Sequence, residues 1–396
     1  MTRRRSALAI LFVIVFVDLL GFGMVIPVMP LYARDLGASQ TWTGLLSTGY
    51  SAMQFVFAPI WGRLSDRVGR RPVLLASIFM TALAFLGYGL AGSFAALIAS
   101  RLFAGAATAN IAIARAFVAD VTTPETRARG MGVIGAALGL GFVLGPPMGG
   151  LLSTHVSLAA PGLAAAALAA LNGVAAYFVL PEPEERSVRA EASRHPFTAF
   201  FREMGLPGIR RLVIVYFLTI LAFSAMESTF TFLATDRYDL AEDHVSYLYG
   251  YIGIVLVIVQ GGLISPLTRR FGEVKLLVAG VVMQALALAA LPFMGSPAGL
   301  WLATAPLAAG AGLTQPSISS LLSRMARADE QGGTLGMGES AGALGRIVGP
   351  EAGTFTYGQV WHAAPYLAGG ALMLVAALVG STLRRPAGLP AAPPTT

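Results

Sequence analysis

Long apolar runs, each near the length needed to cross the ~30 Å hydrocarbon core of a bilayer, recur along almost the whole chain. In lipid every backbone N–H and C=O must be paired within the protein, so only helices and closed barrels can span a membrane. The runs are too long and too uniformly apolar for the alternating strands of a barrel. The sequence therefore predicts an all-α integral membrane protein with twelve transmembrane helices, at roughly 7–31, 43–61, 73–91, 94–118, 131–152, 158–180, 210–234, 245–266, 274–294, 299–322, 334–357 and 364–383.

Two motifs repeat at nearly the same offset, which indicates an internal duplication. The string G-x-x-x-G-P-x-x-G occurs at Gly141–Gly149 and returns 204 positions later at Gly345–Gly353. Arg67-Val68-Gly69 likewise corresponds to Arg270-Phe271-Gly272, at an offset of 203. Two similar halves of about six spans each are typical of secondary transporters.

This duplication divides the chain into four parts. We expect an N-terminal six-helix half over 1–180 and a C-terminal six-helix half over 210–385. The polar, mixed-charge segment 181–209 reads as a cytoplasmic linker, and the Pro- and Ala-rich segment 386–396 as a disordered tail.

Basic residues are distributed unequally between the two sides of the predicted membrane. Loops on the side of the amino terminus carry 22 of the 27 Lys and Arg residues, and the opposite loops carry only Arg34 and Arg237. By the positive-inside rule, both termini of this multi-pass protein lie in the cytoplasm, and we expect it in the plasma (inner) membrane. The net charge of +7 thus reflects topology and does not indicate a nucleic-acid partner.

Several chemistries are disfavoured by what the sequence lacks. A phosphate-binding loop needs its lysine, but the only lysine, Lys275, follows no glycine-rich loop, so any active transport should draw on an ion gradient. There are no cysteines. The four histidines are scattered and form no metal-binding pattern. We expect no cofactor, no metal site and no enzymatic activity.

The loop between the second and third runs carries a specific charged motif. It reads Gly62-Arg63-Leu64-Ser65-Asp66-Arg67-Val68-Gly69-Arg70-Arg71. This sequence resembles the signature of the major facilitator superfamily, and the resemblance extends over essentially the whole chain. Asp18 to Gly23 and Val118 to Thr122 further resemble the twelve-span, tetracycline-efflux-like branch of drug:proton antiporters.

The resemblance implies that this loop forms a latch, which holds the two halves together on the cytoplasmic side and releases during the inward-facing step. Asp66 should approach the start of the eleventh span, and Arg70 should pair with Asp120 at the end of the fourth. In the second half Arg269 stands where Asp66 would be, so that copy is degraded and we expect the stronger latch in the first half. The alternative is a loop that only sets topology. The predicted latch residues are Gly62, Asp66, Arg67, Gly69, Arg70 and Asp120.

The repeated glycine–proline motif has a stripe of glycines at i, i+4 and i+8, which allows close helix approach. By the resemblance it is typical of drug–proton antiporters, where it forms a sealed interface between the halves; the alternative is generic small-residue packing. The predicted interface residues are Gly141, Gly145, Pro146, Gly149, Gly345, Gly349, Pro350 and Gly353.

The tetracycline exporters of this branch carry acidic residues in spans three and nine, but the runs 73–91 and 276–294 have none, which puts tetracycline itself in doubt as the substrate.

Ionisable residues inside the spans are functional candidates, because a charge in the bilayer is costly. Asp18 and Glu227 are the first proton-coupling candidates, since spans one and seven are equivalent cavity-lining helices in the superfamily. By the resemblance Arg101 matches an arginine associated with proton transfer; a structural ion pair is the alternative. Arg346 could instead pair with Glu339 at i−7, and Glu351 could be a second titrating group.

Aromatic and amide side chains embedded near these charges could shape a pocket for an amphipathic molecule, although packing is the alternative for each. The candidates are Phe22, Gln54, Asn110, Phe223, Phe230 and Gln315. Together the sequence predicts a monomeric carrier, in contact with membrane lipids, that exchanges protons for a small amphipathic substrate or drug and contributes to antibiotic resistance. The alternatives are a proton-coupled symporter of a small metabolite, or an uncoupled lipid-handling or receptor-like membrane protein.

Overall fold

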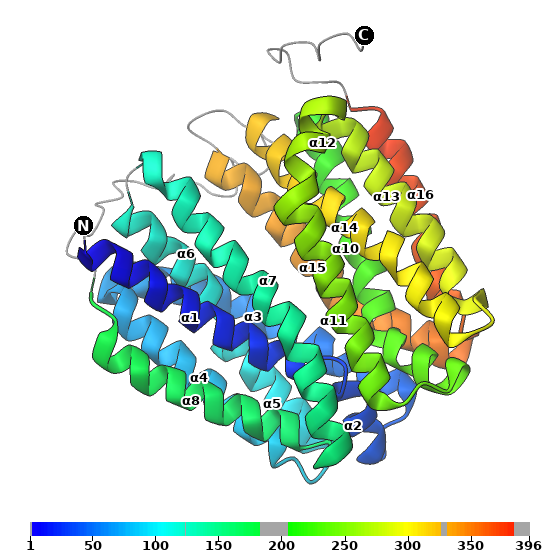
Figure 1. Cartoon of the computed structure of the whole chain (residues 1–396), viewed down its shortest axis with the longest axis horizontal. Coiled ribbons are helices and arrows are strands. Elements are labelled where there is room, and N and C mark those ends of the chain that lie inside the picture. Colours follow the sequence, from blue (N-terminus) through cyan, green and yellow to red (C-terminus); the bar gives the residue numbers. More distant parts are fainter. Residues whose placement is uncertain (1, 123, 183–204, 326–330, 384–396) are drawn as a thin grey trace. The chain divides into compact units, whose positions relative to one another are not determined.

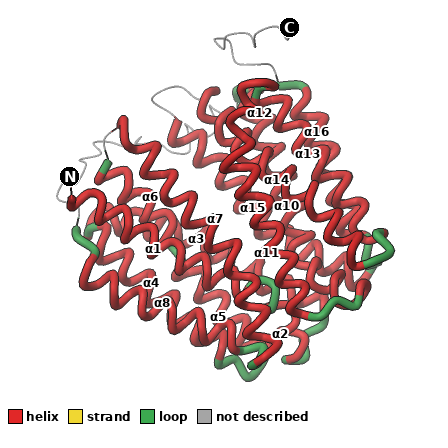
Figure 2. Tube along the Cα trace, in the orientation of Figure 1, coloured by secondary structure: helices red, strands yellow, loops and turns green. Residues whose placement is uncertain are grey.

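The computed structural model describes residues 2–122, 124–182, 205–325 and 331–383. These residues form helices and connecting turns and no strand (Figures 1 and 2). The prediction of an all-α chain is confirmed. Most of the predicted linker 181–209 and the whole tail 386–396 lie outside the described residues.

Contacts within the chain define two units, which are described separately. Unit 1 comprises Met1–Ala190 and Leu240–Gly253, and unit 2 comprises Glu191–Asp239 and Ile254–Thr396. The segment Leu240–Gly253, expected in the second half, thus groups with unit 1. Unit 1 contains α1 (Thr2–Val25), α2 (Met29–Asp35), α3 (Gln40–Val68), α4 (Arg70–Gly89), α5 (Phe94–Ala107), α6 (Asn110–Val121), α7 (Pro124–His155), α8 (Ala160–Val179) and the first part of α11 (Glu242–Ile258).

Unit 2 repeats the packing of unit 1. Its helices are α10 (Pro207–Phe232), the rest of α11, α12 (Ile264–Phe271), α13 (Glu273–Ala290), α14 (Pro297–Met325), α15 (Gln331–Gln359) and α16 (Ala364–Ser381). In unit 1 α1 packs along α7, and α4 packs on α5 and α8. In unit 2 α10 packs along α15, and α13 packs on α14 and α16. The repeated arrangement agrees with the duplication seen in the sequence.

Nine helical stretches of the described chain are long and apolar enough to cross a membrane. The other three predicted spans lie in α3, α14 and α15, each of which has 29 residues. At ~1.5 Å per residue these helices exceed the ~30 Å of a hydrocarbon core. For these three, the prediction of twelve spans therefore rests on length.

Two predicted spans are interrupted. The first ends at Val25, and Pro27 lies in the turn that leads into α2, because proline cannot donate the helical hydrogen bond. The fourth, expected to be continuous over 94–118, is divided at Thr108 and Ala109 into α5 and α6. Neither residue is Gly or Pro, so composition gives no signal for this break.

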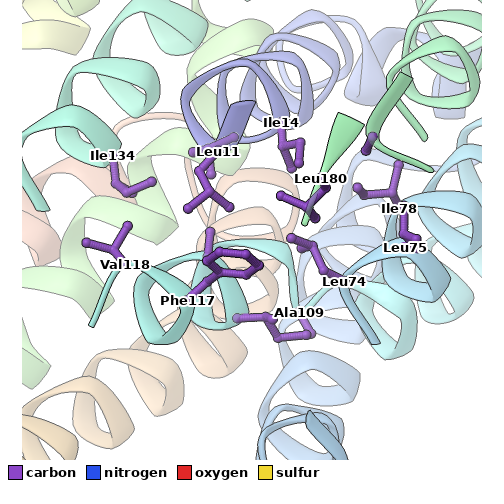
Figure 3. Packing of buried hydrophobic residues seen from close by; sticks show 14 of the residues in the cluster. Leu11, Ile14, Leu74, Leu75, Ile78, Ala109, Phe117, Val118, Ile134 and Leu180 are labelled. Carbon is purple, nitrogen blue, oxygen red and sulfur yellow. The ribbon is translucent and has the colours of Figure 1, made fainter. Parts of the chain in front are cut away.

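The core of unit 1 around α6 is apolar and closely packed. Phe117 and Val118 of α6 are fully buried and lie near Leu11 of α1, while Leu74 of α4 closes the other side (Figure 3). Burying side chains of this size stabilises the fold by roughly 1.5–3 kcal/mol each. The core therefore holds α6 against α1 and α4.

Candidate functional site

Asp18 lies on α1 and is hydrogen-bonded to Asn110, the first residue of α6. Asp18 is 9% exposed and Asn110 is 1% exposed. Asn110 Nδ2 donates to Asp18 Oδ1 over 2.9 Å, while Asn110 Oδ1 is buried without a hydrogen-bond partner. From the sequence, Asp18 is a proton-coupling candidate and Asn110 a candidate for the substrate pocket. The fold brings the two residues together because the fourth span breaks beside α1.

Arg101 lies on α5 and is buried among tyrosines, with 3% exposure. Its guanidinium carbon is 4.6 Å from the ring centroid of Tyr50 on α3, and its Nε has no hydrogen-bond partner. Tyr50 in turn lies against half-buried Phe22, one turn from Asp18, with ring centroids 5.6 Å apart. The described contacts of Arg101 are thus aromatic, and the structural ion pair considered from sequence is not among them.

In unit 2 Glu227 on α10 is half-buried, and Arg346 on α15 is the charged group that acts on it electrostatically. Arg346 also lies 4.0 Å from Glu339, one of the alternatives left open by the sequence. The side chain of Glu339 is 62% exposed, so water screens that pair strongly. We therefore regard Glu227 as the more relevant partner of Arg346.

The remaining candidates are dispersed. Glu351 has one buried carboxylate oxygen, Oε2, without a hydrogen-bond partner. Phe230 is fully buried in the core of unit 2, whereas Gln54, Phe223 and Gln315 are half-buried. Their roles in a substrate pocket stay predictions.

The charged motif, which the sequence places in a loop, lies at the end of α3 and the start of α4 with only Gly69 between them, and it forms a cluster centred on Arg70. Arg70 Nε donates to Asp120 Oδ2 over 2.9 Å, and Arg70 Nη1 contacts Asp66 Oδ1 and Ser65 Oγ, each at 2.6 Å. The pairing of Arg70 with Asp120 is the one that the family resemblance implies. Both side chains are about nine-tenths buried, so this ion pair is shielded from water. Its role as a latch, and the approach of Asp66 to the eleventh span, stay predictions.

Sequence reasoning missed one member of this cluster, Glu182. Its carboxylate accepts hydrogen bonds from the backbone N–H groups of Arg70 at 2.9 Å and Arg71 at 3.2 Å. It therefore caps the amino terminus of α4, where a negative charge is favoured. Gly69 makes this approach possible, because its φ is +120° and a Cβ there would lie 2.6 Å from Glu182 Oε1. The sequence offers only an acidic residue two positions after the sixth apolar run, and nothing near it indicates its partner.

The second copy of this cluster has Arg269 in place of Asp66, but it contains a related ion pair that the sequence interpretation did not identify. Arg324 Nε at the end of α14 lies 3.2 Å from Glu273 Oε1 at the start of α13, and Ser320 Oγ donates to the same oxygen. Glu273 corresponds to Arg70 and Arg324 to Asp120, at offsets of 203 and 204. The ion pair is therefore retained with its two charges exchanged. The motif does not indicate this pair, because each position carries the opposite charge from the one in the first copy.

The glycine stripe of the repeated motif serves contacts inside each unit. A Cβ on Gly145 would lie 2.7 Å from Leu20 O on α1, and one on Gly349 would lie 2.7 Å from Leu221 O on α10. These glycines contact the first helix of their own unit. The role of the motif at an interface between the halves stays a prediction. One stripe can face only one neighbour, and the other side of α7 presents Pro147 toward Gly250 of α11, within unit 1.

Comparisons with known proteins agree with this architecture. A family model described as the Major Facilitator Superfamily matches residues 11–350 and 261–396. The class C tetracycline resistance protein of Escherichia coli is 33% identical over 383 residues, covering 94% of this chain and 96% of that protein. Multidrug resistance protein 2 of Bacillus subtilis is 27% identical, with 91% of each chain covered. The crystal structure of the human organic anion transporter MFSD10 superposes with a TM-score of 0.73 at 26% identity, covering 95% of this chain and 99% of that one.

Proposed function

The chain belongs to the major facilitator superfamily of membrane transporters, and we propose that it exports small amphipathic compounds or drugs by proton-coupled alternating access. One observation carries this proposal: each unit has a carboxylate on its first long helix, within the apolar span. Asp18 on α1 and Glu227 on α10 occupy equivalent elements of the repeat. A carboxylate within a span is costly unless it is paired, protonated or faces water, so it is a functional candidate by default, and alternate protonation is a use that suits a carrier.

A sequence motif of the chain and the names of its relatives favour export over import. The glycine–proline motif is present in both halves, and the relatives include proteins named for tetracycline and multidrug resistance. The positive-inside bias supports cytoplasmic termini, and the same bias supports a cytoplasmic location for the Arg70 cluster. We propose that this cluster holds the inner side of unit 1 together and loosens during the inward-facing step.

The test is substrate-driven proton movement in proteoliposomes with an imposed pH gradient. Ethidium, as a lipophilic cation, and tetracycline serve as probes, and Asp18→Asn and Glu227→Gln are compared with the unmodified chain. Asp236→Asn is the matched control, because Asp236 is an exposed carboxylate beyond the end of α10. We expect proton flux opposite to probe flux, lost in Asp18→Asn or Glu227→Gln and retained in the control.

Other outcomes identify the alternatives. Proton and probe moving in the same direction would indicate a symporter of a small metabolite. Probe movement that ignores both the pH gradient and the two substitutions would contradict proton coupling and favour the uncoupled, lipid-handling alternative. Each of these results rejects the antiport proposal.

A second substrate class, organic anions, is favoured by Arg101. A buried guanidinium whose Nε lacks a partner is suited to binding a carboxylate or sulfonate. The structural relative MFSD10 is described as an organic anion transporter. If anions are the substrates, Arg101→Gln should abolish uptake of a fluorescent carboxylate such as fluorescein while ethidium transport is unaffected. Equal loss of both probes would instead assign Arg101 to the coupling step or to the fold.

A further inference from the structure

The break in the fourth span is built into the interior of unit 1. Thr108 is extended, with φ −76° and ψ 104°, and the helical hydrogen bonds are interrupted there. Ser77 Oγ on α4 donates to Ala107 O over 2.7 Å and accepts from Ala109 N over 3.0 Å. These bonds replace those that the helix has lost, as a break inside a membrane requires. The break is therefore a supported joint between two half-helices.

Asn110 places an adaptable amide beside Asp18 at this joint. An ionised carboxylate only accepts hydrogen bonds, whereas a protonated one also donates through its O–H. The amide of Asn110 matches both states: its Nδ2 donates to Asp18 Oδ1 now, and its buried Oδ1 is an acceptor without a partner. Gain of a proton by Asp18 would favour a turn of the amide that brings Oδ1 toward the new donor.

The half-helix α6 connects this joint to the Arg70 cluster. It has 12 residues, and Asn110 and Asp120 lie near its opposite ends, roughly 15 Å apart along the axis. Its buried face, with Phe117 and Val118, packs as one surface against α1 and α4 (Figure 3). A displacement of α6 as one body at Asn110 would therefore reach Asp120, which accepts the hydrogen bond from Arg70.

We propose that α6 is a lever: Asn110 senses whether Asp18 carries a proton, the half-helix pivots at Thr108–Ala109, and the Arg70–Asp120 pair responds. This rests on the proposed proton coupling and makes Asn110 a positioning residue for it. In the described part of the chain, the helices packed against α1 carry few charged residues. The packed helix α8 contains no Asp, Glu, Lys, Arg or His, and α7 carries its charged residues only near its two ends, at Glu125, Arg127, Arg129 and His155. On α6 itself Arg115 is exposed and Asp120 belongs to the Arg70 cluster.

The absence of cysteine from the chain allows a single-label test. A nitroxide is attached at Thr122→Cys, the residue directly after α6, in the full chain reconstituted in liposomes. Its mobility is followed by electron paramagnetic resonance between pH 5 and pH 8, in the labelled parent and in the added variants Asp18→Asn, Asn110→Leu and Asn110→Ser. The matched control is Asn172→Leu, because Asn172 on α8 is also a buried amide and donates to Ile14 O on α1 over 3.4 Å.

We expect the label's mobility to change with pH in the parent, to stay fixed in Asp18→Asn, and to lose its pH response in Asn110→Leu. Asn110→Ser, whose hydroxyl both donates and accepts, should keep part of the response, and Asn172→Leu should keep all of it. A parent without a response, a full response in Asn110→Leu, or an equal loss in Asn172→Leu would overturn the lever. If Asn110→Leu does not fold, a response in Asn110→Ser no larger than in Asp18→Asn contradicts the proposal.

The measurements distinguish a failure of the proposed lever from a failure of the proposed proton coupling. Proton flux that depends on Asp18, together with a label that responds without Asn110, rejects the lever and keeps proton-coupled transport. A label that responds through Asp18 and Asn110 in a chain whose transport ignores the pH gradient supports the lever and rejects the coupling.

Discussion

Gly69 illustrates how one residue determines the geometry of the charged loop. Its φ of +120° is strained for any residue with a Cβ, and a Cβ would also meet the Glu182 carboxylate. We predict that Gly69→Ala destabilises the protein by about 1–3 kcal/mol, measured as a lower melting temperature in detergent. Gly62→Ala is the control, since a Cβ at Gly62 meets nothing within 4 Å. Equal effects of the two substitutions would show that neither the φ angle nor Glu182 matters.

Single residues also mark the limit of prediction from sequence. The pairing of Arg70 with Asp120 was implied by the family resemblance, and the structure contains it. The carboxylate of Glu182 reaches the same loop from 112 positions away, and no local pattern encodes such a contact. The partnership of Asp18 with Asn110 was missed for a similar reason. This hydrogen bond depends on a helix break at 108 and 109, and the residue types at those positions do not predict a break.

At the scale of elements, the glycine stripe of α7 sets the distance between α7 and α1. Gly145 faces Leu20 O and Gly23 Cα, so any side chain there must push the helices apart. We predict that Gly145→Val costs about 1–3 kcal/mol of stability. Gly135→Val on the same helix should cost far less, because a Cβ at Gly135 meets nothing within 4 Å. Thermal unfolding of both variants tests this, and equal melting temperatures would contradict it.

Helix positions were predicted well where the apolar runs are long, because the cost of exposing backbone groups to lipid leaves few alternatives. The run at 158–180 coincides closely with α8, and the run at 364–383 with α16. Interruptions within spans were predicted poorly. The break after α5 is stabilised by Ser77 from another helix, and such long-range support is not visible in a local window.

For the whole molecule, the two units preserve an ion pair although they exchange its charges. Arg70 and Asp120 in unit 1 become Glu273 and Arg324 in unit 2, each joining the start of one helix to the end of another. The attraction between two opposite charges is the same when both charges are reversed. Duplicated halves can therefore exchange the two charges in the course of evolution without losing the contact. The duplication therefore maintains the interaction and not the residue types, which is why the residue types of the motif do not indicate the Glu273–Arg324 pair.

This view gives a charge-reversal prediction for unit 2. Glu273→Arg places two cations together and Arg324→Glu two carboxylates, so each should destabilise the protein by about 1–3 kcal/mol, reduced by the 45% exposure of Arg324. The double variant should recover most of that loss, because it recreates the arrangement of unit 1. Lys275→Glu is the control, since Lys275 is exposed on the same helix. A double variant as unstable as the sum of the singles would mean that the surroundings, and not the pair alone, fix which charge each helix carries.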